Sequence, residues 1–322
     1  MIKLSEEQQK IAEIFYPYSM EKFLNIQEKE KKFVYYTSAE SALKIIQSKE
    51  FWMRKTSCMN DYTEVQHGLE CLVVSYKDDG KGVGEQFRLA INSIFPGISQ
   101  EIEKLFDGWE FSLSTNSFIA CVSEHHRKED VLGRLSMWRA YAGSSGVAIV
   151  MNNEALLQPS DALGAYSFPV AYFEKDQFKI QIEKLAQNIS AHADFVKSLG
   201  RENVKGYIFQ AFKTAVLCTK HPGFDEELEW RVVHTPDLNP STRLIKAVET
   251  IGGVPQPIYK VPLVDIPEEN LVGIEIPELI HHIIIGPTDY PAAMADAFKF
   301  ALTEAGATDV DNKVVVSSIP LR

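Results

Sequence analysis

Hydrophobic residues recur along the chain with two different periods. Short apolar or alternating runs, which are typical of β-strands, lie at 33–37, 51–54, 117–123, 147–152, 165–173, 227–233, 256–264, 271–276, 281–285 and 313–319. Longer stretches with apolar residues three or four positions apart predict helices at 5–32, 39–48, 62–76, 85–106, 131–141, 174–200, 204–221 and 290–305. This mixture predicts an α+β fold whose short strands form a mostly buried central sheet.

No internal repeat, low-complexity segment or clear linker divides the sequence. We therefore expect an N-terminal helical segment over 1–32, followed by a single α+β domain over 33–322. Within that domain, the long helical stretch at about 174–221 is interpreted as an insertion. The candidate motifs described below are spread over the whole length, so neither half contains a complete site.

The alternation is clearest in Phe224–Val233, which reads FDEELEWRVV. In a strand, its two faces would carry apolar and charged side chains respectively: Leu228, Trp230 and Val232 against Glu227, Glu229 and Arg231. Same-face neighbours lie about 7 Å apart, so the charged residues would form one row. Two interpretations remain open. The row is either a solvated ladder of ion pairs, or a pocket wall in which the arginine keeps one carboxylate ionised while the other binds a ligand.

Composition and charge narrow the function classes. A hydrophobic content of 45% and a charged content of 24% are ordinary for a soluble globular protein. The net charge of −11 argues against a broad electrostatic grip on duplex DNA or acidic membrane, although a local basic patch remains possible. No apolar run approaches the roughly 20 residues of a membrane span. The acidic, amphipathic start of the chain predicts no signal peptide.

The four cysteines are scattered, and no two of them form a CxxC pair. Cys71 and Cys121 lie in apolar surroundings, so they are expected to be buried thiols rather than metal ligands or disulfide partners, and the expected setting is a reducing cytoplasm. The histidines also show no pattern that is typical of a metal site. His125-His126 and His281-His282 are adjacent pairs, whose side chains point in different directions in a helix or a strand, so neither pair is a ready-made metal site. With no HExxH motif and no acidic calcium loop, the sequence predicts no metal.

Three further clusters have both structural and functional interpretations, and they are Tyr35-Tyr36-Thr37, Asn60-Asp61 with Glu64, and Trp138 with Tyr141. The first is explained by ordinary β-propensity or by ligand contacts. The second is explained by helix capping or by a polar loop at a pocket edge. The third is explained by a core contact at an i,i+3 spacing or by an aromatic wall for a planar ligand.

Taken in order, these segments resemble a known family. FVYYTSAESALKIIQSKEFWMRK, Asn60-Asp61-x-x-Glu64, ACVSE, WRAYAGSSGVAI, ELEWRVV and IIIGP are similar to the motifs of the bacterial domain-of-unknown-function family 2971 (DUF2971). The resemblance runs from Phe33 to Pro287. Tyr62 replaces the proline of the family's loop and Val122 replaces the aromatic residue of its Ser-Glu strand, and neither change removes a polar group.

The same opening segment is more distantly similar to the NAD-dependent ADP-ribosyltransferases. In that superfamily, a histidine or arginine two residues before a hydroxyl residue holds the ribose of NAD, and a late glutamate promotes departure of nicotinamide. Thr37 matches the hydroxyl residue and Glu227-x-Glu229 matches the late pair, whereas position 35 is tyrosine. The resemblance implies the corresponding fold, with NAD as the substrate.

The resemblance also implies roles for the site residues. Glu229 would stabilise the oxocarbenium ion, Glu227 would activate or align the acceptor, and Arg231 would hold a phosphate or pair with Glu229. Tyr35, Tyr36 and Trp138 would flank the rings of NAD. Thr37, Asn60, Asp61 and Tyr141 would complete the binding site.

Three hypotheses follow from the sequence. The first is a cytoplasmic enzyme that transfers ADP-ribose to an unidentified protein or nucleic acid, or hydrolyses NAD. By analogy, it would act in bacterial phage defence or toxicity. The second is a metal-dependent phosphodiesterase or nuclease that uses Asp61, Glu64, Glu227 and Glu229, with a histidine as a possible further ligand. The third is a sensor module that binds a ligand without chemistry.

Overall fold

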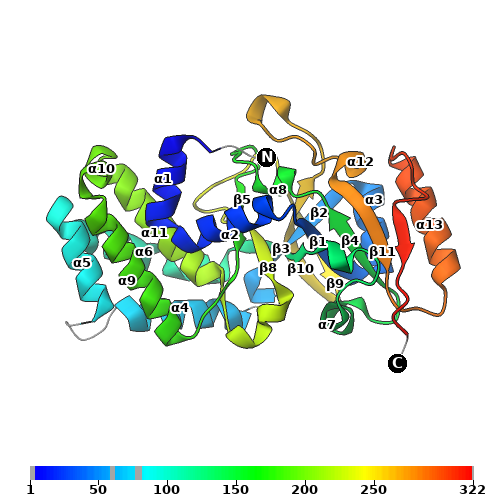
Figure 1. Cartoon of the computed structure of the whole chain (residues 1–322), viewed down its shortest axis with the longest axis horizontal. Helices are drawn as coiled ribbons and strands as arrows, with labels where there is room; N and C mark the ends of the chain where they lie inside the picture. The colour runs from blue at the N-terminus through cyan, green and yellow to red at the C-terminus, as the bar shows by residue number, and fades with distance from the viewer. Residues whose placement is uncertain (1–3, 59–61, 77–81, 321–322) are drawn as a thin grey trace.

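The computed structural model describes residues 4–58, 62–76 and 82–320. A half made of helices and a half built on a β-sheet lie side by side along the longest axis (Figure 1). Within the described residues, ten strands form one sheet that is antiparallel except for one parallel pair, β11 with β12. The α+β fold class predicted from the sequence is therefore confirmed.

The sheet contains most of the strands that the sequence predicts. Its strands are β1 (Lys32–Ser38), β2 (Glu50–Lys55), β3 (Phe118–His125), β4 (Gly146–Met151), β5 (Ala165–Pro169), β8 (Glu229–His234), β9 (Ile245–Ile251), β10 (Val254–Pro262), β11 (Ile280–Ile285) and β12 (Val314–Val316). They follow the order β12-β11-β4-β1-β3-β2-β10-β9, and β8 pairs with both β3 and β5. A separate parallel pair joins β6 (Ala171–Tyr172) to β7 (Thr219–Lys220).

Strand β3 has different partners at its two ends. It pairs with β1 up to Val34↔Ser123, and it pairs with β2 from Arg54↔Ile119 onward. Between these two ladders, β1 continues beside β4 while β2 continues beside β10. The strands therefore diverge and leave an opening in the sheet that is bounded by β1, β2 and β3.

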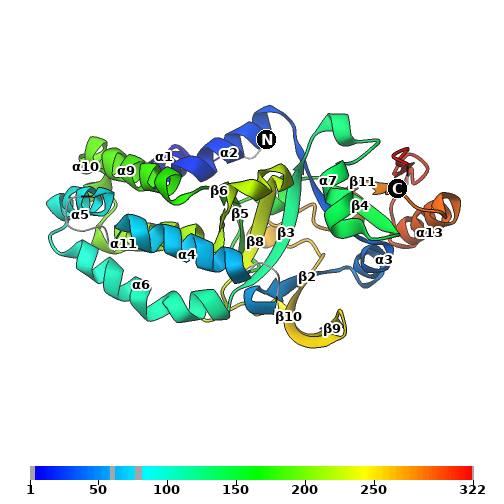
Figure 2. The same ribbon diagram turned by 90° about the horizontal axis from the view of Figure 1, so that it is seen from below.

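Helices pack on the sheet and also build the second half of the molecule (Figure 2). Near the sheet lie α2 (Pro17–Glu28), α3 (Ala39–Ser48), α7 (Leu135–Met137), α8 (Glu154–Leu157), α12 (Ile276–Leu279) and α13 (Pro291–Glu304). The helical half contains α1 (Glu6–Phe15), α4 (Tyr62–Tyr76), α5 (Val83–Ile94), α6 (Ile98–Thr115), α9 (Lys175–Ala191), α10 (Ala193–Ser198) and α11 (Arg201–Leu217). Its core includes Ile119 and Val233 from the sheet, so apolar side chains join the two halves.

The helical half is assembled from separate stretches of sequence. The predicted insertion at 174–221 supplies α9, α10 and α11, but α4, α5 and α6 come from 62–115. The predicted helix at 5–32 is two helices, because Pro17 cannot donate a backbone hydrogen bond and instead begins α2. The helix predicted at 85–106 is also split, since Gly97 takes a left-handed conformation between α5 and α6.

Three other predictions are corrected by the structure. Residues 271–276 do not form a strand, because Pro277 starts α12 after one isolated bridge at Leu271. The helix predicted at 131–141 is limited to α7 and a π-helical turn, Trp138–Ala142. Strand β9 was not predicted, since its side chains are largely exposed and carry little periodic signal.

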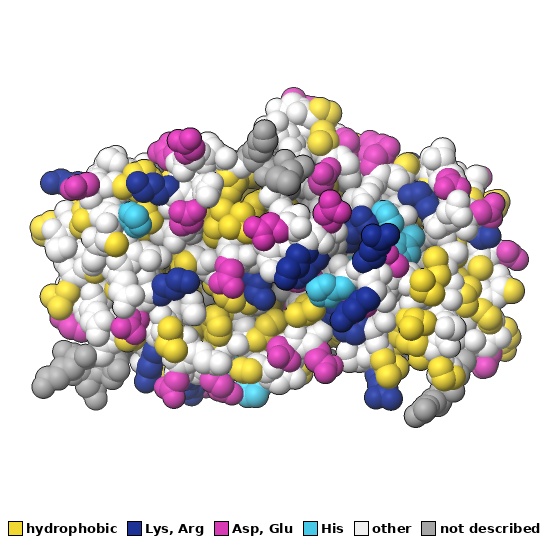
Figure 3. Space-filling model, in the orientation of Figure 1, with side chains coloured by type: hydrophobic (Ala, Val, Ile, Leu, Met, Phe, Trp, Pro, Cys, Tyr) yellow, Lys and Arg dark blue, Asp and Glu magenta, His cyan; other side chains and the backbone are white. Residues whose placement is uncertain are grey.

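The surface shows a mixed charge distribution. On the face shown in Figure 3, acidic side chains are scattered, whereas lysine, arginine and histidine lie closest together over the strands near the middle. The net charge of −11 therefore does not make this face uniformly acidic. Among the described residues, no helix is both long and apolar enough to cross a bilayer.

Candidate functional site

A cavity of about 310 Å³ occupies the opening between β1, β2 and β3. Six of the residues that the sequence singles out line it: Tyr35, Tyr36, Thr37, Tyr141, Glu227 and Glu229. They come from three segments that are far apart in the sequence, and the divergence of the strands brings them together. Asn60 and Asp61 lie outside the described residues.

Glu227 and Glu229 both line the cavity, but they do not lie on one continuous strand as predicted. Residues Pro222–Glu227 form a 3-10 helix, Leu228 has a left-handed φ of 47°, and β8 begins only at Glu229. The prediction that Glu227 belongs to the strand is therefore wrong. The turn at Leu228 nevertheless places Glu227 in the lining of the same cavity as Glu229.

Within β8 itself, the predicted division of faces is confirmed. Glu229 and Arg231 lie on the side of the charged cluster. Trp230 and Val232 face the sheet core, where the Trp230 ring lies 5.3 Å from that of Phe33.

Five charged side chains meet at the cavity wall, and Lys220 lies at their centre. Its Nζ is 2.8 Å from Glu64 Oε1, 2.6 Å from Glu227 Oε2 and 3.2 Å from Glu229 Oε2. Lys220 is the last residue of β7, and its side chain is buried. One ammonium group thus holds three carboxylates together.

Arg231 is the second cation of the cluster and is completely buried. Its Nε donates to Glu229 Oε1 at 2.8 Å, its Nη1 donates to the Leu217 carbonyl oxygen at 2.7 Å, and its Nη2 donates to Glu64. It lies behind the carboxylates and does not line the cavity. Of the two roles predicted for Arg231, the geometry matches pairing with Glu229 rather than contact with a phosphate.

The cations keep Glu229 ionised. Burial alone would raise the pKa of this carboxyl group, but Arg231 and Lys220 outweigh that effect and lower the pKa to about 2. Burial would lower the pKa of the Lys220 ammonium group, yet the surrounding carboxylates raise it above its usual value. Three carboxylates against two cations leave a net charge of −1 on the cluster.

Because Glu229 is ionised in the folded protein, we expect the free energy of unfolding to decrease at acidic pH. Its pKa is about 2 in the folded protein, against an ordinary 4.5. Because the folded-state pKa is the lower one, the stabilisation is complete above the ordinary pKa and is lost as the pH falls from about 4.5 towards 2. We expect a loss on the order of 3 kcal/mol, measured by urea unfolding at several pH values. The Glu229→Gln variant should lack this component, and an equally steep acid dependence in that variant would contradict the assignment.

Tyrosines orient the two glutamates of the cavity wall. The Tyr141 hydroxyl donates to Glu227 Oε1 at 3.0 Å, and the Tyr172 hydroxyl accepts a 2.8 Å hydrogen bond from the Glu229 backbone N–H. Burial is the main cause that raises the pKa of both phenols, so both remain neutral hydrogen-bonding groups.

The aromatic residues of the predicted ring site take different positions. Tyr36 lines the cavity, accepts a 2.8 Å hydrogen bond from the Arg134 backbone and stands edge-on to Trp138 with centroids 4.8 Å apart. Trp138 is buried behind Tyr36, so it supports that ring and does not flank a ligand as predicted. Tyr35 lines the cavity and packs edge-on against Phe51 at 4.8 Å.

Sequence reasoning missed two cationic residues of the site. Lys220 lies inside the helix predicted at 204–221, but the structure ends that helix at Leu217 and places Lys220 in β7, and no sequence pattern marks it as a partner of Glu227. Arg54 also lines the cavity, and its Nη2 donates to Cys58 O at 3.0 Å and Gln256 Oε1 at 3.1 Å. Its Nε is buried and has no hydrogen-bond partner among the described residues. Arg54 therefore presents a free donor in the cavity region.

A second cavity, of about 430 Å³, lies across the sheet opening and shares Phe51, Ala120 and Val122 with the first. The described residues that line it include no charged side chain, and most of them are apolar. It offers volume and apolar surface but no group suited to acid–base or electrostatic catalysis. The candidate chemistry is therefore confined to the smaller cavity.

Comparison with known proteins gives one match. Residues 137–232 match a family model described as "Protein of unknown function (DUF2971)". This stretch is similar to the DUF2971 family. It contains Tyr141, Lys220, Glu227, Glu229 and Arg231, whereas the contributions of β1, β2 and α4 to the site lie outside it. The resemblance to DUF2971 is confirmed over these residues. No curated protein and no solved structure is significantly similar to the chain.

Proposed function

We propose that this protein cleaves the bond between nicotinamide and ribose in NAD, as an ADP-ribosyltransferase or an NAD glycohydrolase. The observation that carries the proposal is the ionised, immobilised Glu229 in a cavity wall whose charge cluster has a net charge of −1. NAD carries a positive charge on its nicotinamide ring, and cleavage transfers positive character to the ribose. A fixed negative wall favours both species, and it favours the transition state without reorganisation.

Glu229 and Glu227 have different roles in the proposed reaction. As the bond from ribose C1′ to the ring nitrogen breaks, its electron pair leaves with nicotinamide, and the carboxylate of Glu229 stabilises the oxocarbenium ion that remains. Water or an acceptor group then attacks C1′, and its proton passes to Glu227, which Tyr141 and Lys220 hold in place.

Arg54 provides the recognition of the anionic part of NAD. Arg54 lines the cavity together with the carboxylates, and its guanidinium group could donate to a phosphate oxygen there. Tyr35 and Tyr36 supply aromatic surface for a base or for nicotinamide. This assignment replaces Arg231 as the phosphate contact.

The position of Lys220 weighs against the metal-dependent alternative. Its ammonium group lies within 3.2 Å of the carboxylates of Glu64, Glu227 and Glu229, where that hypothesis would place the cation. A divalent ion at the same point would have to displace a buried, charged lysine. The third hypothesis, binding without turnover, remains an outcome of the experiments.

The biological setting also remains a proposal. The cysteines at 58, 71, 121 and 218 are all free, which fits a reducing cytoplasm. There, an enzyme that consumes NAD could limit infection by depleting the cofactor of its own cell. A role in bacterial phage defence or toxicity rests on that analogy alone.

Binding of NAD to protein treated with EDTA tests the proposal. We expect saturable binding by calorimetry without metal, and at least tenfold weaker binding by Arg54→Met, because a charge-assisted hydrogen bond contributes about 1.5–3 kcal/mol. Arg243→Met is the matched control, since Arg243 pairs with Glu269 and does not line the cavity. Absence of binding by the wild-type protein, or equal weakening by both variants, would contradict the proposal.

A further inference from the structure

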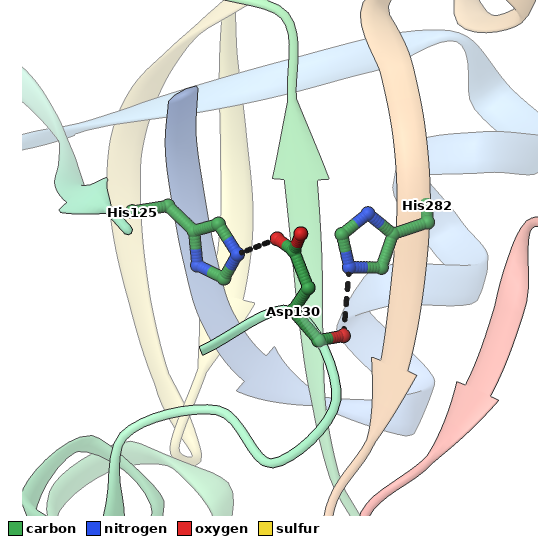
Figure 4. A group of neighbouring side chains, drawn as sticks. All are labelled: His125, Asp130 and His282. Atoms are coloured by element: carbon green, nitrogen blue, oxygen red, sulfur yellow. Dashed lines mark hydrogen bonds and ion pairs between the residues drawn. The ribbon is translucent and has the colours of Figure 1, made fainter. Parts of the chain in front are cut away.

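One histidine from each adjacent pair meets Asp130 at the end of the sheet. His125 ends β3, Asp130 lies in the loop that follows, and His282 lies on β11 (Figure 4). The three potential ligand atoms lie within 4.8 Å of one another. The expectation that adjacent histidines do not form a site together still applies within each pair, but the fold combines members of the two pairs.

We propose that His125, Asp130 and His282 form a binding site for a first-row transition-metal dication such as Zn²⁺. The inference does not depend on the proposed NAD chemistry. Two imidazoles with one carboxylate suit such ions better than Mg²⁺ or Ca²⁺, which prefer oxygen ligands alone.

The distances agree with this assignment. His125 Nε2 is 2.8 Å from Asp130 Oδ1, and His282 Nε2 is 3.1 Å from the Asp130 carbonyl oxygen. Around one octahedral ion, adjacent ligand atoms lie about 3.0 Å apart and opposite ones about 4.2 Å apart, for bonds of about 2.1 Å. The three ligand atoms, which lie within 4.8 Å of one another, would have to move closer together to reach these separations, so the cluster would close on an ion through shifts of its side chains.

Hydrogen bonding around His125 is incomplete without an ion. To donate to Asp130, a neutral His125 carries its proton on Nε2, which leaves a bare Nδ1. That Nδ1 is buried, has no hydrogen-bond partner among the described residues and lies 3.9 Å from Glu129 Oε2. When Nε2 binds a metal, the proton moves to Nδ1 and points towards the Glu129 carboxylate. Metal-bound histidines commonly have such a carboxylate partner.

In His282, too, the proton can move from Nε2 to Nδ1. His282 Nδ1 lies 2.7 Å from His281 Nδ1, so one of these nitrogens donates to the other. If His282 donates, its Nε2 is free to bind the ion, and no proton is gained or lost overall. The two buried histidines and the Asp130 side chain, which is 36% exposed, leave one side of the site open to solvent.

Such an ion would anchor a segment that contacts the turn carrying Glu227. Arg134 donates from Nε to Glu129 Oε1 at 3.1 Å and from Nη1 to the carbonyl oxygens of Glu226 and Glu227 at 2.8 and 3.2 Å. The metal site, Glu129 and Arg134 thus form a chain of contacts to the turn that carries Glu227. The ion would have a structural role in the site.

Equilibrium dialysis of the untagged, EDTA-treated chain against Zn²⁺ tests the proposal. We expect one bound Zn²⁺ per chain and a higher melting temperature with Zn²⁺. His282→Gln and Asp130→Asn, which keep hydrogen-bonding groups, should each bind at least tenfold more weakly. Glu129→Gln should weaken binding by about tenfold, the lower end of the effect of losing a partner of a metal-bound histidine.

His126→Ala and His221→Ala are controls from the same adjacent pair and from elsewhere in the chain, and both should bind like the wild type. The proposal is overturned if wild-type protein binds no Zn²⁺ saturably. It is also overturned if His282→Gln and Asp130→Asn, folded by circular dichroism, bind as tightly as the controls.

Discussion

Replacement of Arg231 by methionine is expected to lower the free energy of unfolding by about 3–5 kcal/mol, the range for breaking a buried ion pair from one side. The variant keeps most of the side-chain volume but removes the cation between Glu64 and Glu229. Three carboxylates would then share Lys220 as their remaining cation, and the charge of the cluster would change from −1 to −2. Urea unfolding of the wild type and variant at neutral pH measures the difference.

Arg243→Met is the matched control for this experiment. Arg243 also pairs with a glutamate, Glu269, but both side chains are 39% exposed. Ion pairs of that kind contribute roughly 0–1 kcal/mol, so the control should remain near the wild type. If the two substitutions lowered the free energy of unfolding equally, the buried ion pairs of Arg231 would stabilise the fold no more than an exposed ion pair does.

Glu229→Gln is expected to reduce turnover of NAD by a hundredfold or more, the scale observed when a preorganised electrostatic group is lost. Glutamine keeps the shape and a hydrogen-bond acceptor, but it changes the cluster from −1 to neutral, with two carboxylates against two cations. Some stability is lost as well, on the order of 3 kcal/mol, because Glu229 is ionised by its partners. Activity must therefore be expressed per folded molecule, with the folded fraction taken from circular dichroism.

Glu226→Gln is the control for this second variant. Glu226 is exposed and lies one residue before Glu227, and the interaction described for it uses its backbone carbonyl. Its turnover should equal that of the wild type. If Glu229→Gln were destabilised but equally active per folded molecule, Glu229 would be a structural partner of Arg231 alone.

The sequence predicted the strands that bound the site because their signal is local. The β-rich composition of Phe33–Thr37 and the alternation in Glu229–Val233 are properties of neighbouring residues, and β1 and β8 occur at those places. It also identified the DUF2971 motifs that contain the site glutamates. Six of the predicted site residues line one cavity as a result.

The parts that could not be predicted depend on contacts between distant segments. Lys220 is central because β7 places it beside Glu64, which is far away in sequence. The 3-10 helix before Leu228 interrupts a perfectly alternating pattern, so the periodicity alone extended the strand by two residues. His125 and His282 illustrate the same limit, since only the strand order brings two separate pairs together.

The burial of Trp138 shows a further limit. An aromatic residue beside a glycine-rich turn has the same sequence signal whether it contacts a ligand or supports another ring. In the structure, Tyr36 lies between Trp138 and the cavity. Which of two packed aromatic rings faces a ligand is decided by tertiary packing, and in this chain it is the tyrosine that lines the cavity.

Release of nicotinamide from NAD tests the central claim most directly. Purified wild-type protein, Glu229→Gln and Glu226→Gln are incubated with NAD in EDTA, and free nicotinamide is quantified by chromatography. The account predicts release that is proportional to the wild-type protein and matched by Glu226→Gln, with at least a hundredfold less from Glu229→Gln per folded molecule. If wild-type protein binds NAD but releases no nicotinamide, the cavity is a binding site without this chemistry, and the account is contradicted.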